Sequence, residues 1–183
     1  MQKQQSVAHV LGAVVGSLGL VLVLMSAYSL KQAISRYFDS NRIVSLAVAS
    51  RDMTNALVAF RLERGDVTSF LSSPTAATDS AMNGIAQDRQ NAEQTYKVAQ
   101  ETLAAVEAPG LRDKIGKVQS TWQQMVSLRS QVGPALRQEK ASRDPKLPEN
   151  WLKACDAYMD AVGEATALLD GSMSLIDPVV DRL

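Results

Sequence analysis

The sequence predicts an all-α protein in which an N-terminal transmembrane helix is followed by an up-down-up-down antiparallel four-helix bundle. Residues 7–30 contain no Asp, Glu, Lys or Arg, and no second run of this kind follows. Beyond it, apolar residues recur at alternating steps of three and four, the period of helices that pack against one another. We therefore divide the chain into residues 1–30, a short tail with the membrane helix, and residues 31–183, the bundle.

The apolar run is long enough to cross a bilayer, because helix of that length extends about 36 Å against a hydrocarbon core of about 30 Å. A cleaved signal peptide is the alternative, since Ala27 and Ser29 fit positions −3 and −1 of a cleavage site. The run exceeds the roughly 7–15 apolar residues of a signal peptide core. Lys3 is the only basic side chain before it, whereas signal peptides begin with a positively charged region. Both points favour a retained anchor.

Three breaks separate four helices after the anchor. The first helix, residues 31–71, continues the membrane helix and ends where Pro74 disfavours helical backbone in the residue before it. The second covers residues 79–106, with Thr78 or Asp79 as its N-cap. Pro109 and Gly110 break the chain after it.

The third helix is expected over residues 111–143, with a kink at Gly133-Pro134 because proline removes a backbone hydrogen bond. A proline-rich break at residues 144–148 follows, and the fourth helix starts at Pro148, a favourable first-turn residue. Its apolar seam comprises Trp151, Cys155, Tyr158, Val162, Ala165, Leu169, Ser172, Ile176, Val179 and Leu183. Short connections make neighbouring helices antiparallel, which yields the bundle.

The first helix carries a second apolar row, made of Val44, Val48, Val58 and Leu62. An apolar stripe wider than one seam indicates a second packing partner. We interpret the row as the contact of a homodimer, with a broad core face as the alternative.

No combination of residues in the sequence predicts an enzyme. The only histidine, His9, lies in the anchor, so a Ser-His-Asp triad is excluded, and the only cysteine, Cys155, lies on an apolar seam. There is no glycine-rich phosphate loop and no cysteine cluster for a metal. We expect no cofactor and no metal. Because 19 basic residues balance 19 acidic ones, we also expect no nucleic-acid partner.

Arginines interrupt three of the four seams, at Arg64, Arg89 and Arg129. In a folded-back bundle these positions fall at similar heights, and three buried guanidiniums would be costly without partners. A small anionic ligand would relieve that cost, with the expected kink at Gly133-Pro134 opening the space. The candidate ligand-binding residues are Arg64, Arg89, Arg129, Tyr158, Arg61 and Trp151. Pairing of the arginines with Glu63 or Asp88, or outward extension of their side chains, is the alternative.

Arg61-Leu62-Glu63-Arg64-Gly65, an R-x-E-R-G run before the first break, resembles the sensory region of bacterial methyl-accepting chemotaxis proteins. Arg143-Asp144-Pro145 and the segment 175–181 resemble the same receptors. The resemblance implies a cytoplasmic N-terminus, a periplasmic four-helix bundle and a homodimer. It also implies a second membrane helix, a HAMP linker and a cytoplasmic signalling hairpin, which this sequence lacks, so we interpret the chain as an N-terminal fragment.

The sequence thus predicts a single-pass protein of the bacterial inner membrane that senses a ligand in the periplasm. Signalling partners in the cytoplasm would be reached only through the missing C-terminal region. Lys31, Arg36 and Arg42 follow the anchor and favour the opposite orientation by charge alone. The alternatives are the sensor region of a histidine kinase or a diguanylate cyclase, and a membrane-anchored helical adaptor for a partner protein.

Overall fold

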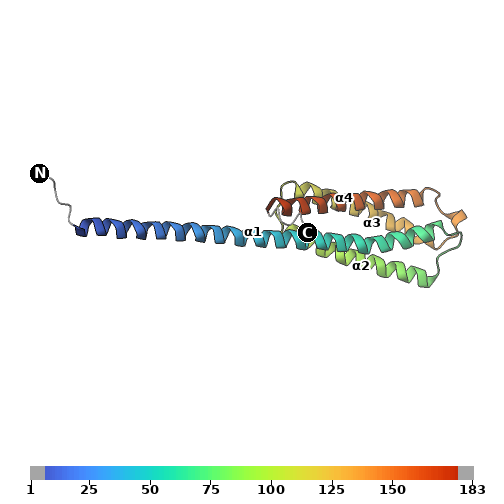
Figure 1. Cartoon of the computed structure of the whole chain (residues 1–183). Coiled ribbons are helices and arrows are strands. Elements are labelled where there is room, and N and C mark those ends of the chain that lie inside the picture. The colour runs from blue at the N-terminus through green and yellow to red at the C-terminus, as the bar shows by residue number, and fades with distance from the viewer. Residues whose placement is uncertain (1–6, 177–183) are drawn as a thin grey trace. The chain divides into compact units, whose positions relative to one another are not determined.

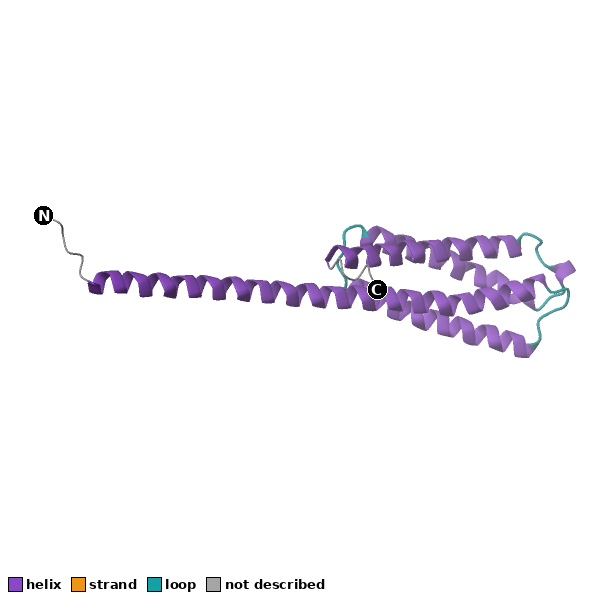
Figure 2. Ribbon diagram, viewed as in Figure 1, coloured by secondary structure: helices purple, strands orange, loops and turns teal. Residues whose placement is uncertain are grey.

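The computed structural model describes residues 7–176, which form helices and no strands (Figures 1 and 2). The elements are α1 (Val7–Ser72), α2 (Asp79–Ala104), α3 (Leu111–Leu136), the 3-10 helix η1 (Lys140–Ser142) and α4 (Leu147–Ile176). The all-helical class is confirmed. Val179 and Leu183 of the predicted fourth seam lie outside the described residues.

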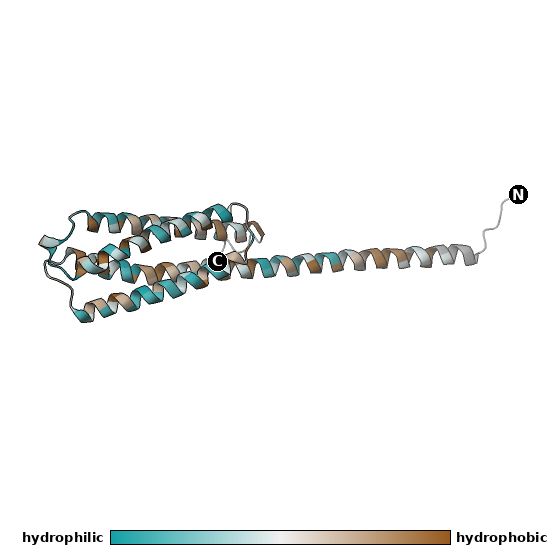
Figure 3. Ribbon diagram, turned by 180° about the vertical axis from the view of Figure 1, so that it is seen from behind, coloured by the Kyte–Doolittle hydropathy of each residue, from teal (hydrophilic) through white to brown (hydrophobic). Residues whose placement is uncertain are grey.

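The chain forms two compact units, the first ending at Arg42 and the second beginning at Ile43. In the first unit the side chains of residues 14–42 are all exposed. Brown, apolar residues gather along this part of α1 in Figure 3. Among the described residues, α1 near the N-terminus is the one helix long and apolar enough to cross a membrane. As predicted from the sequence, no break separates the apolar run from the helix that follows it.

The second unit has one hydrophobic core to which all four α-helices contribute. The predicted seams supply most of it: Leu46, Met53 and Phe60 of α1 are at most 1% exposed, and Trp151 and Tyr158 of α4 are fully buried. A 3.5-residue period keeps one stripe of each helix facing its neighbours, which explains why the seams mark the core.

Polar contacts link the helices of this unit at several heights. The Ser50 hydroxyl of α1 donates to Asp170 of α4 at 2.8 Å. Lys114 of α3 donates to Glu164 of α4 at 2.9 Å, and these two helices pack closely along their lengths. Side-chain contacts therefore join the helices of this unit around a shared interior.

The helix ends follow local chemistry, with one difference from prediction. Thr78 is the N-cap of α2, and its side chain accepts a hydrogen bond from the Ala81 amide at 3.3 Å. The third helix was predicted to reach residue 143, but α3 ends at Leu136, two residues after Pro134. At that end the Leu136 carbonyl accepts from the Ala77 amide at 2.8 Å and the Ala135 carbonyl accepts from Arg143 at 3.0 Å, so these carbonyls bind groups outside the helix instead of continuing it.

Arg143 joins the ends of α1 and α3. Its side chain is buried, with 6% of the residue exposed, and it donates only to backbone carbonyl oxygens. These belong to Phe70, Leu71, Ser73, Thr75, Ala135 and Gln138, at 2.7–3.0 Å. Helix C-termini carry unpaired carbonyls and partial negative charge, so a guanidinium both satisfies and neutralises them. We call this arrangement the Arg143 cage.

Candidate functional site

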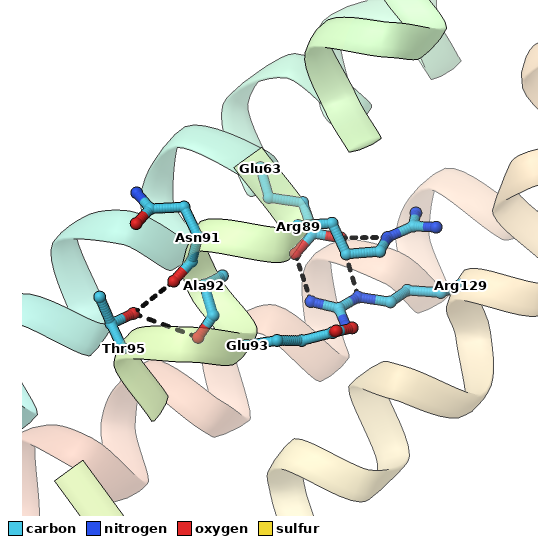
Figure 4. Close-up of polar contacts among 7 residues, drawn as sticks. All are labelled: Glu63, Arg89, Asn91, Ala92, Glu93, Thr95 and Arg129. Atoms are coloured by element: carbon cyan, nitrogen blue, oxygen red, sulfur yellow. Dashed lines mark hydrogen bonds and ion pairs between the residues drawn. The ribbon is translucent and has the colours of Figure 1, made fainter. Parts of the chain in front are cut away.

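Glu63 of α1 is the centre of a buried ion-pair cluster (Figure 4). Its side chain is fully buried. Arg129 of α3 donates to it from Nε at 2.8 Å and from Nη2 at 2.5 Å, and Arg89 of α2 donates from Nε at 3.1 Å. Since a buried carboxylate needs both charge and hydrogen bonds to offset its desolvation, Glu63 depends on these two arginines.

Arg129 makes more hydrogen bonds than either of the other two seam arginines, Arg64 and Arg89. Its Nη1 donates to Glu93 of α2 at 2.6 Å, and its guanidinium carbon lies 5.1 Å from the centroid of the Trp122 ring. The side chain is 5% exposed, against 29% for Arg89. Arg129 therefore binds α1 and α2 together from within the core, whereas Arg89 reaches the same carboxylate from a half-buried position.

Arg64 belongs to a different contact. Its Nη2 donates to Asp156 of α4 at 2.9 Å, and its side chain is 32% exposed. Adjacent residues of α1 thus face different neighbours: Glu63 contacts α2 and α3, and Arg64 contacts α4. The structure brings Arg89 and Arg129 onto one carboxylate but does not add Arg64 to them.

The remaining candidate ligand-binding residues divide between core and surface. Arg61 is exposed. Trp151 and Tyr158 are fully buried, and within residues 7–176 neither the Trp151 indole N–H nor the Tyr158 hydroxyl has a hydrogen-bond partner. The Tyr158 ring contacts Phe60 at a centroid separation of 4.9 Å. Burial raises the pKa of Tyr158, so its hydroxyl stays protonated at neutral pH.

The charges around the arginines already balance. Arg64, Arg89 and Arg129 carry three positive charges, and their partners Glu63, Glu93 and Asp156 carry three negative ones. The repulsion that the sequence analysis expected to drive anion binding is therefore neutralised within the chain. Pairing with Glu63, one of the carboxylates considered in the alternative interpretation, accounts for two of the three arginines.

Asp88, the other carboxylate considered, lies close to Asp66 and Glu63, whereas the ion pairs of the three arginines are with Glu63, Glu93 and Asp156. Burial raises the pKa of Asp88, and the nearby carboxylates of Asp66 and Glu63 raise it further, with a hydrogen bond between the Asp66 and Asp88 side chains. Like charges placed together favour the protonated form. This contact between α1 and α2 is therefore weaker at neutral pH than in acid.

A polar groove between α1 and α2 is a second candidate site. It has a volume of about 220 Å³ and is lined by Asp52, Asn55, Asn91, Gln94, Thr95 and Val98. We call it the Asp52 groove. No sequence pattern marks this groove, because its residues are four common polar side chains, one aspartate and one valine, divided between two helices. Only the pairing of α1 with α2 brings them together.

Residues 14–176 hold no cluster of His, Cys, Asp and Glu side chains placed to bind a metal ion. Cys155 is buried among core residues, and burial raises the pKa of its thiol to about 12. The neighbouring arginines Arg64 and Arg129 lower that pKa and the neighbouring carboxylates Glu63 and Asp156 raise it, while burial has the largest effect. A thiol in this state is a poor nucleophile at neutral pH.

Comparison with known proteins gives one match. The sequence profile of the family described as YuaM protein matches residues 1–125 of the 183, a region that includes α1, α2 and the first half of α3. The chain therefore belongs to the YuaM family. No curated protein and no solved structure matches it.

Proposed function

We propose that this member of the YuaM family is a membrane-anchored, non-enzymatic sensory module that works as a homodimer through α1. The proposal depends on the observation that α1 has three roles. One helix supplies the apolar run, part of the core of the second unit, and an outward apolar row. A change at its outward face is thus made on the element that also enters the membrane.

The outward row has members whose side chains are largely exposed. Val44, Val58 and Leu62 are 57%, 53% and 54% exposed, and Val48 is partly buried. At about 100° per residue, all four lie within about 40° of one line along the helix. Aligned exposed side chains of this kind mark interaction surfaces more often than scattered ones do. A second copy of α1 offers the same row, so it is a self-complementary partner.

The contacts between helices support an up-down-up-down order. Ser50 and Arg64 of α1 contact Asp170 and Asp156 of α4, respectively, so rising residue numbers on one helix meet falling numbers on the other. The connections between α1 and α2 and between α2 and α3 are six residues each, residues 73–78 and 105–110, as in helix bundles with antiparallel neighbours. We infer that the second unit is a four-helix bundle of this type.

We further propose that the bundle lies in the periplasm of a bacterium, anchored in the inner membrane by residues 7–30. This placement rests on the apolar run and on the resemblance to chemoreceptors, and it opposes the local charge pattern. Reporter fusions at Leu183 test it. An export-dependent reporter should be active there, and activity of a cytoplasm-dependent reporter would reverse the orientation.

Disulfide cross-linking tests the dimer. In a Cys155→Ser background, Val44→Cys, Val58→Cys and Leu62→Cys should each form a covalent dimer in native membranes. The control is Thr54→Cys, which is exposed but lies about 80° from the row and should cross-link far less. Equal cross-linking at all four positions, or none, would refute the α1 interface.

An adaptor that binds a different protein is the second candidate function. The observation that favours it is the pairing of all three seam arginines with carboxylates of the chain, which leaves the predicted anion pocket without free cations. The same cysteine variants distinguish the two. Row cysteines that cross-link to a different protein, and not to a second copy, indicate the adaptor.

A further inference from the structure

The Asp52 groove combines a sheltered carboxylate with an exposed rim. The Asp52 side chain is 7% exposed, whereas Asn55, Asn91 and Gln94 are all exposed. Thr95 of α2 donates its hydroxyl hydrogen to the backbone carbonyls of Asn91 and Ala92, at 2.9 and 3.1 Å (Figure 4). Its lone pairs are left to accept. The groove therefore presents one carboxylate beside amide and hydroxyl groups whose oxygens can accept hydrogen bonds.

The carboxylate already holds a cation that can be displaced. Arg51 donates to Oδ1 of Asp52 from Nε at 3.0 Å and from Nη2 at 2.9 Å, yet the Arg51 side chain is 66% exposed. Ion pairs with so exposed a partner contribute about 0–1 kcal/mol, so the arginine can turn into solvent at little cost. The Arg51 guanidinium on Asp52 thus shows that this carboxylate can bind a planar nitrogen cation.

We propose that the Asp52 groove binds a small organic cation of the ammonium or guanidinium class, whose charge takes the place of Arg51 on Asp52. The amide oxygens of Asn55, Asn91 and Gln94 would accept its remaining N–H groups, and Val98, which is 43% exposed, would contact its hydrocarbon part. The volume of about 220 Å³ equals that of about seven water molecules. Ligands of a few heavy atoms fit this space, and larger ones would extend beyond it.

The inference rests on the proposed sensory function and names the ligand class for it. Its position is consistent with that role, because Asn55 lines the groove and also lies on the outward face of α1. A ligand there would change the charge on that face by placing one cation in the groove and releasing another, Arg51, from it.

Calorimetry on the full chain in lipid nanodiscs tests the proposal, with methylguanidinium and 1,4-diaminobutane as cationic probes and acetate and nitrate as anionic ones. We expect the cations to bind and the anions not to. Asp52→Asn should weaken cation binding at least about tenfold, the loss of about 1.4 kcal/mol. Arg51→Ala should strengthen it severalfold, because the competing internal cation is gone. The matched control is Asp160→Asn on α4, which should leave affinity unchanged.

The test is strict because substitutions of two adjacent residues, Arg51→Ala and Asp52→Asn, should change the affinity for cations in opposite directions. If Asp52→Asn lowers the thermal midpoint of the protein, the rim variant Gln94→Ala replaces it, and a loss of affinity of about threefold is then expected. Weaker cation binding by Arg51→Ala, or no cation binding at about 10 mM, would overturn the inference. Cross-linking along α1 is measured without any cationic probe. Failure of the cation-binding proposal can therefore be distinguished from failure of the dimer proposal.

Discussion

Replacement of Arg143 by alanine should destabilise the second unit far more than replacement of an exposed arginine in the same connection. Of the seven hydrogen bonds that its guanidinium makes, the two to the Leu71 and Ala135 carbonyls lie in buried surroundings, and five are part-buried. Water can replace the donor at the part-buried carbonyls. At the two buried ones it cannot, and each unsatisfied group costs about 1–3 kcal/mol.

The expected loss is therefore about 2–6 kcal/mol, from two buried carbonyls at that cost each. At about 2–4 °C per kcal/mol for a unit of this size, the thermal midpoint should fall by about 4–24 °C. Arg143→Lys should lower the free energy of unfolding by less than Arg143→Ala does, because the ammonium keeps the positive charge. It should still be less stable than the wild type, because the ammonium cannot reach both helix ends. Thermal unfolding of the full chain in nanodiscs, followed by circular dichroism, measures these shifts.

Arg137→Ala is the matched control, since Arg137 is an exposed arginine in the same connection. It should change stability by no more than about 0.5 kcal/mol. Free guanidinium at about 10 mM, far below denaturing concentrations, should partly restore the alanine variant by binding the vacated carbonyls. If Arg143→Ala and Arg137→Ala unfold at the same temperature, the cage is not a stabilising element and the reasoning from carbonyl satisfaction is wrong.

Three further predictions concern the charged and titratable groups. Glu63→Gln should cost about 3–5 kcal/mol in urea unfolding, because the buried Arg129 guanidinium loses its buried carboxylate and keeps only the exposed Glu93 as a charged partner. Asp88→Asn should stabilise the protein at neutral pH: the folded-state pKa of Asp88 is raised, so stability falls as pH rises from its ordinary value of 3.8 through the raised one. Cys155, whose pKa is about 12, should react with thiol reagents at pH 8 only as fast as the protein unfolds.

Each of these has a contrary result. A Glu63→Gln loss no larger than that of Glu93→Gln, whose side chain is 55% exposed, would mean that burial does not set the strength of the cluster. A stability gain from Asp88→Asn that persists at about pH 2, where the wild-type carboxyl is protonated, would rule out charge repulsion as its cause. Rapid labelling of Cys155 under native conditions would contradict its burial.

The positions of the core residues were predictable because helical periodicity depends on neighbours in sequence. The seam through Leu46, Met53 and Phe60 could be read directly, and the core follows it. The burial of Arg129 was also predictable, since it interrupts an otherwise apolar row. What periodicity could not decide was the rotation of α1 by one residue, which places Glu63 in the interior and Arg64 at its edge.

The Arg143 cage and the Asp52 groove could not be predicted for a different reason. The partners of Arg143 are backbone carbonyls, which every residue has, so no side-chain pattern marks them. The groove needs the register of α1 against α2, because Asp52 and Gln94 are far apart in sequence. Both features arise from tertiary placement of unremarkable residues, and neither has a motif.

The adjacent contacts of Glu63 and Arg64 constrain how α1 can move. Turning the helix about its axis by one residue, about 100°, would break both ion pairs at the same time, that of Glu63 with Arg129 and that of Arg64 with Asp156. A shift along the axis by one residue is about 1.5 Å, which long arginine side chains can follow by changing rotamer. The two neighbouring ion pairs of opposite sense therefore oppose twisting of α1 more strongly than they oppose sliding.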